Sequence, residues 1–335
     1  MEQNNISLGK PLADKPSLSQ QEIDEHFMRR CLQLAKNGRQ NAKPNPMVGA
    51  VIVSEDGRIL GEGYHVRCGE GHAEVNAFAS VKPEDEHLLA GATIYVSLEP
   101  CSHYGKTPPC ADLIVAKGVK RVVVGCIDPF ARVSGRGIQR LRDAGIEVRV
   151  GVLERECRWL NRRFITMHTH HRPYIILKWA QTADGFLDDH YKPTMISNAM
   201  TQMVSHRLRA ESDAILVGRV TAERDKPQLN VRHWVGPAPE RIVLSHSTTI
   251  DAILERLYTE QRQSLIVEGG ASTLKSFIDR DLWDELRVET GTAVVGEGTK
   301  APQVPATARL DINRMYGNND YRIYHNHSLL KLHDQ

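Results

Sequence analysis

Two residues near the start of a predicted helix have types that could perform chemistry together. The segment GHAEVNAF, residues 71–78, places His72 and Glu74 two positions apart. On an α-helix such residues point about 200° apart, so one can bind a ligand while the other reaches around it. A metal ligand beside a proton carrier would suit this arrangement. A solvated histidine at a helix start gives the same pattern, so the residues downstream must decide between the two interpretations.

Two cysteines downstream supply the partners that a metal site would need. Cys101 and Cys110 lie in LEPCSHYGKTPPCADLI, residues 98–114; each follows a proline, and the second opens a predicted helix. One histidine and two cysteines form a three-ligand zinc set that leaves a fourth position for water. Bound zinc lowers the pKa of that water toward neutrality, and a helix N-terminus favours the thiolate form of cysteine. Glu74 would take a proton from the water and deliver it to a leaving amine.

This set resembles the site of the zinc nucleobase deaminases, which have His-x-Glu followed by Pro-Cys-x-x-Cys. The difference is that eight residues separate the cysteines here, rather than two. The alternatives are a closed structural zinc site and two buried thiols. A closed site needs a fourth protein ligand, and only His103 is available near that spacing. The position of Glu74 favours an open zinc site with His72, Cys101 and Cys110 as ligands.

Length and composition predict two globular domains and exclude several classes of protein. The chain has 335 residues, 41% of them hydrophobic and 25% charged, which is enough for two cores. Its net charge of +2 gives no overall field that would favour nucleic acid or an anionic membrane. No apolar stretch is long enough to span a membrane, and residues 1–22 lack a signal-peptide core and are expected to be a disordered tail. We therefore expect a cytoplasmic protein, in which six cysteines serve metal binding or burial rather than disulfides.

The pattern of the first half predicts a layered α/β domain with a largely parallel sheet. Helices are expected over residues 24–38, 72–81, 111–118 and 137–145, and strands over 45–53, 57–65, 92–100, 121–128 and 146–152. The strand at 57–65 should be the hairpin partner of the one before it. A basic helix from residue 153 then leads into a histidine-rich segment. Its histidines are not at metal-ligand spacing, so residues 166–173 are expected to be a solvated linker.

The second half predicts another α/β domain. Strands are expected at 174–185, 213–220, 241–247 and 285–290, a helix at 198–212, and a strand, glycine turn and helix at 265–280. The G-x-G-x-x-G fingerprint of a dinucleotide site is absent. In VEGGASTL, residues 267–274, a buried strand turns through two glycines into a helix. Backbone N–H groups at such a helix start can bind phosphate, although glycines in α/β turns often serve packing alone.

The order of these motifs resembles the bifunctional riboflavin-biosynthesis deaminase/reductase family. PNPMVGAVIV, GYH, HAEVNA, EPCSHYGKTPPC and DP…VSGRGI resemble the deaminase half, and RPYIILKWAQTADG, HRLRAESDAILVGRVT, DKPQLNVR and VEGGASTL resemble the reductase half. The resemblance implies a zinc-dependent, cytidine-deaminase-like domain over residues 23–165 and an NADPH-dependent, dihydrofolate-reductase-like domain over residues 174–335. It also implies deamination of 2,5-diamino-6-ribosylamino-4(3H)-pyrimidinone 5′-phosphate at C2, followed by reduction of its ribosyl group to ribityl.

The resemblance assigns further site residues. The phosphorylated pyrimidine would be bound in the deaminase half by Asn45, His65, His103, Lys106 and Asp128. NADPH would contact Ala180, Thr221, Asp225, Gly270 and Ala271, and the substrate of the reductase would contact Arg209, Arg232 and Glu268. Guanidinium groups suit phosphate oxygens, although surface arginines as often pair with acidic residues.

The sequence also departs from the family pattern. Phe130-Ala131 replaces the common Asn-Pro, and Phe130 is therefore not counted as a site residue; Pro193, Met195 and Lys226 replace a serine, a tryptophan and an aspartate of the reductase half. Two other functions compete with the family's. A tRNA deaminase is disfavoured by the near-neutral charge and the second domain, and a non-catalytic zinc scaffold would have lost one or both activities. The family implies a homodimer or homotetramer with a small-molecule substrate and neither a nucleic-acid nor a membrane partner.

Overall fold

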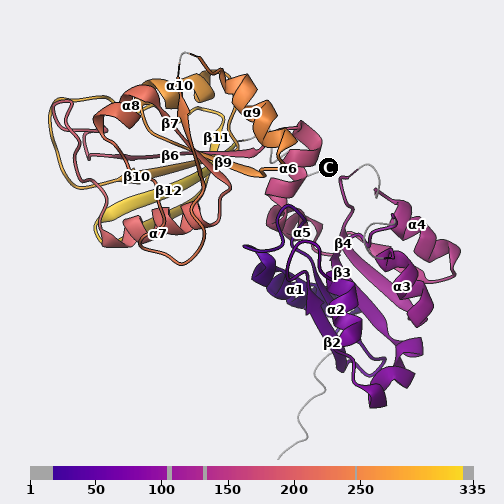
Figure 1. The fold of residues 1–335 in the computed structure, drawn as a ribbon. Helices are drawn as coiled ribbons and strands as arrows, with labels where there is room; N and C mark the ends of the chain where they lie inside the picture. Colours follow the sequence, from indigo (N-terminus) through magenta and orange to yellow (C-terminus); the bar gives the residue numbers. More distant parts are fainter. Residues whose placement is uncertain (1–17, 104–107, 131–133, 246, 327–335) are drawn as a thin grey trace, which may run out of the picture.

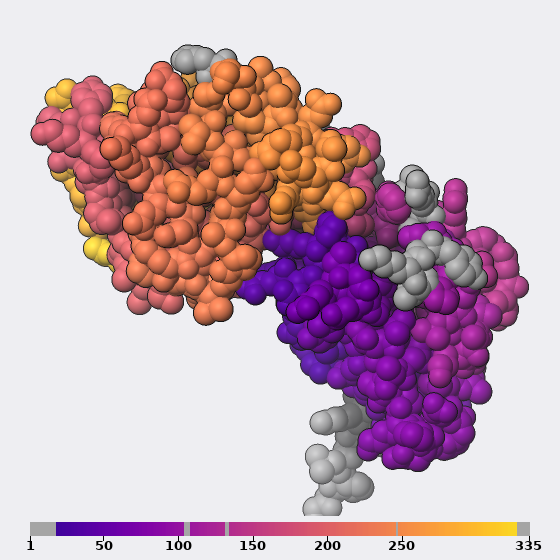
Figure 2. All heavy atoms as spheres, viewed as in Figure 1, coloured from indigo at the N-terminus to yellow at the C-terminus, as the bar shows by residue number. Residues whose placement is uncertain are grey.

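A computed structural model describes residues 18–103, 108–130, 134–245 and 247–326. These residues form two α/β domains joined by two short helices (Figure 1). Both lobes are visible in Figure 2, where orange atoms of the C-terminal lobe lie against indigo atoms of the N-terminal one. In the described part of the chain, no helix combines the length and the apolar character that crossing a membrane requires.

The N-terminal domain is built on a five-stranded sheet of order β2-β1-β3-β4-β5. The strands are β1 (Gly49–Val53), β2 (Ile59–Tyr64), β3 (Thr93–Leu98), β4 (Arg121–Cys126) and β5 (Glu147–Val150). The helices are α1 (Gln20–Ala35), α2 (Ala73–Ala79), α3 (Cys110–Lys117) and α4 (Arg136–Asp143), with two 3-10 segments at Lys36–Gly38 and Pro83–Gly91. Strands β3, β4 and β5 are parallel, but β1 is antiparallel to both β2 and β3. The predicted hairpin of β1 and β2 is therefore confirmed, whereas the prediction of a largely parallel sheet was wrong at β1 and β3, which are also antiparallel.

Helix α1 begins earlier than the sequence pattern indicated. Ser19 is its N-cap, and a capping box joins the Ser19 and Glu22 side chains to each other's backbone, which satisfies N–H groups that the first helical turn leaves free. The expected tail at residues 1–22 is thus too long at its C-terminal end; residues 1–17 lie outside the described part of the chain. The buried face of α1 carries Phe27, Met28 and Cys31 and covers one side of the sheet.

The C-terminal domain has a seven-stranded sheet of order β11-β12-β10-β6-β9-β7-β8. Its strands are β6 (Tyr174–Gln181), β7 (Ala214–Gly218), β8 (Glu240–Leu244), β9 (Ser264–Glu268), β10 (Glu285–Thr290), β11 (Ala308–Tyr316) and β12 (Asn319–Asn326). Its helices are α7 (Ala199–Ala210), α8 (Arg219–Arg224), α9 (Ile250–Thr259) and α10 (Ala271–Asp279). The five strands from β10 to β8 are parallel, and β9 and β7 are buried along their whole length. The sequence pattern missed α8, α9, β11 and β12.

The junction between the domains is mostly helical rather than a solvated linker. It consists of α5 (Glu154–Leu160) and α6 (Arg162–His170). Helix α6 buries the side chains from Phe164 to Met167, and His168 packs against the rings of Phe164 and Phe130, with centroids 4.4 and 5.1 Å away. The expectation of a solvated linker over residues 166–173 was wrong at its start, because α6 continues to His170 and buries Thr166 and Met167, whereas residues 169–171 are exposed.

Candidate functional site

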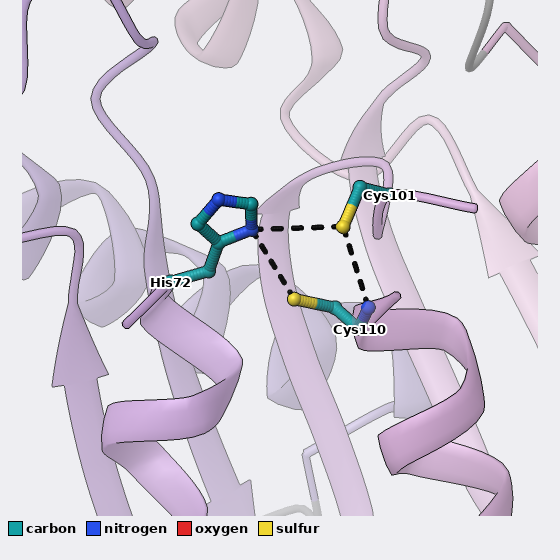
Figure 3. Close-up of side chains that lie close together, drawn as sticks. All are labelled: His72, Cys101 and Cys110. Carbon is teal, nitrogen blue, oxygen red and sulfur yellow. Dashed lines mark hydrogen bonds between the residues drawn. The ribbon is translucent and has the colours of Figure 1, made fainter. Parts of the chain in front are cut away.

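The three predicted zinc ligands meet at the ends of three different elements. His72 is the N-cap of α2, Cys110 is the first residue of α3, and Cys101 lies three residues beyond the end of β3. Nδ1 of His72 lies 3.6 Å from Sγ of Cys101 and 3.3 Å from Sγ of Cys110 (Figure 3). The ligand atoms all lie within 4.8 Å of one another. Tetrahedral bond lengths to zinc imply nitrogen–sulfur separations of about 3.6 Å, so the donor set fits this metal.

Hydrogen bonds favour the thiolate form of one of the two cysteines. The backbone N–H of Cys110 donates to Sγ of Cys101 over 3.3 Å. Hydrogen bonds from the Cys110 thiol and from His72 lower the pKa of Cys101 to about 4, whereas the hydrogen bond to Cys101 and burial raise the pKa of Cys110. The pair therefore holds one negative charge and one proton at neutral pH. A dication would displace the remaining proton on binding.

Glu74 lies beside this cluster with its carboxyl group buried. Burial raises the pKa of Glu74 to about 7. A carboxyl group with a pKa near the working pH can both accept and return a proton. The structure therefore places Glu74 beside the cluster that contains His72, and the two roles predicted from the His-x-Glu spacing stay predictions.

Close packing of α2 on β2 brings His72 and Glu74 into place. A Cβ atom on Gly63 would lie 2.3 Å from the backbone nitrogen of Ala77, and one on Gly61 would lie 2.4 Å from the Ala77 carbonyl oxygen. Only glycines allow this approach. The side chain of Asn76 donates to the carbonyl of Tyr64 over 2.8 Å, which fixes the helix on the strand. The two glycines of GEGYH are therefore needed for α2 to pack closely enough on β2 to place His72 and Glu74.

A buried carboxylate holds the other side of the cluster. Glu99 accepts the backbone N–H groups of Asp128 and Gly135 on one oxygen, over 3.3 and 2.9 Å, and those of Gly137 and Ile138 on the other, over 2.9 and 3.3 Å. It therefore joins the end of β3, which leads to Cys101, to the loop after β4 and the start of α4. Sequence reasoning missed Glu99, because a glutamate between a strand and a proline has no distinguishing pattern.

Several predicted substrate residues line one cavity of about 750 Å³ together with the zinc ligands His72 and Cys101; they are Asn45, His65, His103 and Asp128. Nδ1 of His65 lies 3.1 Å from the carbonyl oxygen of Gly71, which can only accept, so this nitrogen carries the proton and Nε2 accepts from the Asn45 amide over 3.1 Å. Burial lowers the pKa of His65 and raises the pKa of Asp128 to about 6. Lys106 lies outside the described residues.

Other residues line this cavity without having been predicted. Phe130, which was not counted as a site residue, lines the cavity, and so does His168 from the segment expected to be a linker. The remaining surprise comes from the C-terminal domain, which contributes Tyr258, Gln261 and Gln263. No signal in the sequence could connect these positions with zinc ligands that precede them by more than 140 residues.

A second cavity of about 750 Å³ lies in the C-terminal domain at the carboxyl ends of its parallel strands. It is lined by every residue predicted to contact NADPH, namely Ala180, Thr221, Asp225, Gly270 and Ala271, and also by Glu268. Gly269 and Gly270 have φ angles of 109° and 64°, a region that favours glycine. This turn exposes the N-terminal end of α10 to the cavity, as a phosphate site requires.

The predicted arginines are placed differently from the cofactor residues. Arg209 forms a bidentate pair with Glu268, with distances of 3.2 and 2.6 Å. Arg232 is exposed and donates to the side chains of Gln228 and Asn230. Neither arginine belongs to the cavity lining. Of the predicted substrate residues in this domain, Glu268 alone lines the cavity, and Arg209 reaches it through Glu268.

Comparison with known proteins supports both halves of this description. Residues 21–126 match the model of the cytidine and deoxycytidylate deaminase zinc-binding region, and residues 173–252 and 247–315 match that of the RibD C-terminal domain. The riboflavin biosynthesis protein RibD of Aquifex aeolicus is 38% identical over 322 residues, which cover 83% of this chain and 89% of that protein. The chloroplastic riboflavin biosynthesis protein PYRD of Zea mays is 46% identical over 308 residues, covering 79% of this chain and 77% of that protein.

Solved structures show the same two-domain arrangement. The diaminohydroxyphosphoribosylaminopyrimidine deaminase/5-amino-6-(5-phosphoribosylamino)uracil reductase of Thermotoga maritima has a TM-score of 0.84 and 34% identity, covering 92% of this chain and all of that one. RibD of Acinetobacter baumannii has a TM-score of 0.82 and 29% identity over 92% of this chain. The zinc-ligand cluster beside Glu74, the glycine-lined cavity of the second domain and these likenesses lead to one conclusion: the chain belongs to the RibD family of bifunctional riboflavin-biosynthesis proteins.

Proposed function

We propose that the chain carries out two successive reactions on one phosphorylated pyrimidine. The first replaces the amine at C2 of 2,5-diamino-6-ribosylamino-4(3H)-pyrimidinone 5′-phosphate by oxygen from water and releases ammonia. The second adds a hydride at C1′ of the opened ribose and a proton, which gives the ribityl chain. The observation that carries the proposal is the cluster of His72, Cys101 and Cys110 with Glu74 buried beside it.

In the first reaction each group of the site has a distinct task. Zinc, held by the three clustered ligands, supplies water of near-neutral pKa when it is bound. Glu74 would accept a proton from water at that site and would deliver it to the departing amine, as its raised pKa allows. The amide of Asn45, oriented by Nε2 of His65, keeps a carbonyl oxygen free to accept from the edge of the base. Asp128 lies on the same cavity wall and would contact the ribose.

In the second reaction the residues of the C-terminal cavity position a cofactor and a sugar. NADPH supplies the hydride when it is bound, and the protein mainly orients it. The backbone at Gly270 and Ala271 opens α10 toward the cavity and would hold its phosphates. Glu268 lies on the cavity wall, and its ion pair with Arg209 fixes a carboxylate where hydroxyl groups of the substrate would donate.

A coupled assay on the zinc-loaded protein tests both steps, with ammonia and NADPH oxidation followed together. We expect both signals, with NADPH oxidation requiring prior ammonia release. Ammonia without NADPH oxidation would restrict the function to the first step and direct attention to Pro193 and Met195. Absence of both signals would refute the proposal. The variant Glu74→Gln should keep its zinc and lose ammonia release, whereas Glu55→Gln, which changes an exposed residue, should behave like the unchanged protein.

We further propose that the protein acts in the cytoplasm as a homo-oligomer. All six cysteines are free and lie within the described residues, which suits a reducing compartment. Strand β11 forms the outer edge of its sheet and exposes Leu310, Ile312 and Met315. An unpaired apolar edge strand is a ready surface for association with another chain. Mass measurement in solution by light scattering tests whether the chain is a dimer or tetramer.

A further inference from the structure

The cavity lined by the zinc ligands His72 and Cys101 is shared between the two domains. Its residues come mostly from the N-terminal domain and from α6, but one wall consists of the C-terminal end of α9 and the turn that leads from it to β9. This wall contributes Tyr258, Thr259, Gln261 and Gln263. Oη of Tyr258 lies 2.9 Å from Nδ1 of His171 at the end of the interdomain helix, which holds this turn against the junction. A domain proposed to perform reduction thus forms part of the deamination cavity.

The segment that carries Asn45 is fixed from outside its own domain. Nε2 of Gln263 donates to the carbonyl oxygen of Pro44 over 2.5 Å, and Gln263 is buried. One residue earlier, Nζ of Lys43 donates to Oδ1 of Asp213 over 3.0 Å and to the carbonyl of Glu211 over 2.9 Å. These three partners all belong to the C-terminal domain.

Gln263 and Asp213 are themselves rigidly placed. The carbonyl of Gln263 accepts from the backbone N–H of Tyr174 over 2.9 Å, so this residue extends the ladder between β6 and β9. Asp213 forms two hydrogen bonds with Ser264, the residue that follows Gln263. Its backbone N–H donates to Oγ of Ser264, and that hydroxyl donates to its carboxylate. The N-terminal edge of the seven-stranded sheet therefore presents two fixed groups to residues 43–44, immediately before Asn45.

The remaining support of this segment comes from the junction. Asn161, between α5 and α6, donates to the carbonyl of Met47 and accepts its N–H, both over 2.8 Å. The backbone on both sides of Asn45 is therefore held by hydrogen bonds, at Pro44 by Gln263 and at Met47 by Asn161. Its own side chain meets His65 over 3.1 Å. Displacement of Pro44 would therefore move the Asn45 amide that lines the cavity.

We infer that Gln263, a residue of the reductase domain, is a positioning residue for deamination, because its hydrogen bond to Pro44 holds Asn45 in place for the phosphorylated pyrimidine. The inference rests on the deaminase activity proposed above. It assigns no proton transfer to Gln263, so loss of its amide should weaken substrate binding more than it slows the chemical step. The zinc ligands lie on other elements and should be unaffected.

Two variants of the full-length, zinc-loaded protein test this assignment. Gln263→Met keeps the volume but removes the donor, and Gln263→Asn keeps an amide that is too short to reach Pro44. For both, we expect the KM for ammonia release to rise about tenfold, equivalent to about 1.4 kcal/mol, with kcat changed less than threefold. Zinc content should stay at one per chain, and reduction of the deaminated substrate should be unchanged. The matched control is Gln303→Met, which alters an exposed glutamine of the same domain.

Each outcome bears on the assignment separately from the proposed function. If the unchanged protein released no ammonia, the proposed deaminase function would fail before any variant was compared. A KM within twofold of the unchanged protein in both variants would overturn the role of Gln263. An equal loss of deamination and reduction in both variants would overturn it as well, because Gln263 would then serve only the folding of its own domain.

Discussion

The replacement of one buried oxygen of Glu99 by an amide tests how the zinc cluster is supported. In Glu99→Gln, either orientation of the new side chain places an NH₂ group against two backbone N–H groups. The protein then loses two of its four hydrogen bonds, to Asp128 and Gly135 or to Gly137 and Ile138. Hydrogen bonds to a charged group contribute about 1.5–3 kcal/mol each. We therefore expect the deaminase domain to lose about 3–6 kcal/mol of its free energy of unfolding.

Calorimetry of the whole protein measures this loss. The unfolding transition of the deaminase domain is identified as the one that moves when a chelator removes zinc, because a ligand stabilises only the domain that binds it. For a domain of this size the expected loss lowers that transition on the order of 10 °C. The transition of the reductase domain should stay where it is. The KM for ammonia release should also rise, because Glu99 holds the backbone of Asp128.

The control makes the same chemical change on the surface of the same domain. Glu55 forms an ion pair with Lys120 over 3.1 Å, and the two side chains are 77% and 62% exposed. Such pairs contribute at most about 1 kcal/mol, so Glu55→Gln should move the transition by no more than a few degrees. If Glu99→Gln moved it no further than this control does, the buried carboxylate would not be what holds the loop after β4.

Three other predictions follow from residues elsewhere in the chain. Burial lowers the pKa of His206 to about 4, so the folded state binds fewer protons than the unfolded state between about pH 4 and 6.5, and stability rises with pH there. In His206→Asn the fall in the free energy of urea unfolding of the reductase domain from pH 7 to pH 5 should be smaller by about 2 kcal/mol; an unchanged fall would exclude this role. In Gly137→Ala the new Cβ would lie 2.0 Å from the Pro100 carbonyl oxygen, so a chelator should remove zinc from this variant at about tenfold lower chelator concentration. The control is Gly91→Ala, whose new Cβ would lie 3.7 Å from its nearest neighbour. Equal retention of zinc by both variants would contradict the packing argument. Cys110→Ser should lose zinc, measured by atomic emission, and ammonia release together, while reduction of the deaminated substrate continues; full zinc content would remove Cys110 from the ligand set.

The zinc site could be predicted from the sequence because its residues stand at the ends of elements with clear patterns. His72 and Cys110 begin helices α2 and α3, and Cys101 follows strand β3. The residue types at such positions indicate their chemistry directly. A parallel arrangement of strands and helices also brings the ends of these elements together at one edge of the sheet. The glycine turn of the second domain was predictable for the same reason. The cofactor residues around it come together as the family resemblance implied.

The parts that escaped prediction depend on contacts between segments far apart in the chain. Residues 166–173 have the composition of a linker, yet Phe164 and Met167 face the core and extend α6 through them. His168 becomes a wall of the deaminase cavity only because α6 passes that cavity. Gln263 has no local signal at all, since its importance lies in a single hydrogen bond to Pro44. Tertiary packing overrides local pattern at each of these places.

Strand β9 connects the two sites physically. Gln263 immediately precedes its first residue and meets the deaminase cavity, whereas Glu268 is its last residue and lines the reductase cavity. At about 3.3 Å per residue, these positions are roughly 17 Å apart along a strand that is buried throughout. The sheet that supports the reductase site therefore also holds Asn45 in place, through the hydrogen bond from Gln263 to Pro44. Separating the two halves would therefore remove a wall and an anchor from the deaminase cavity, whereas the reductase cavity is lined by residues of the C-terminal domain alone.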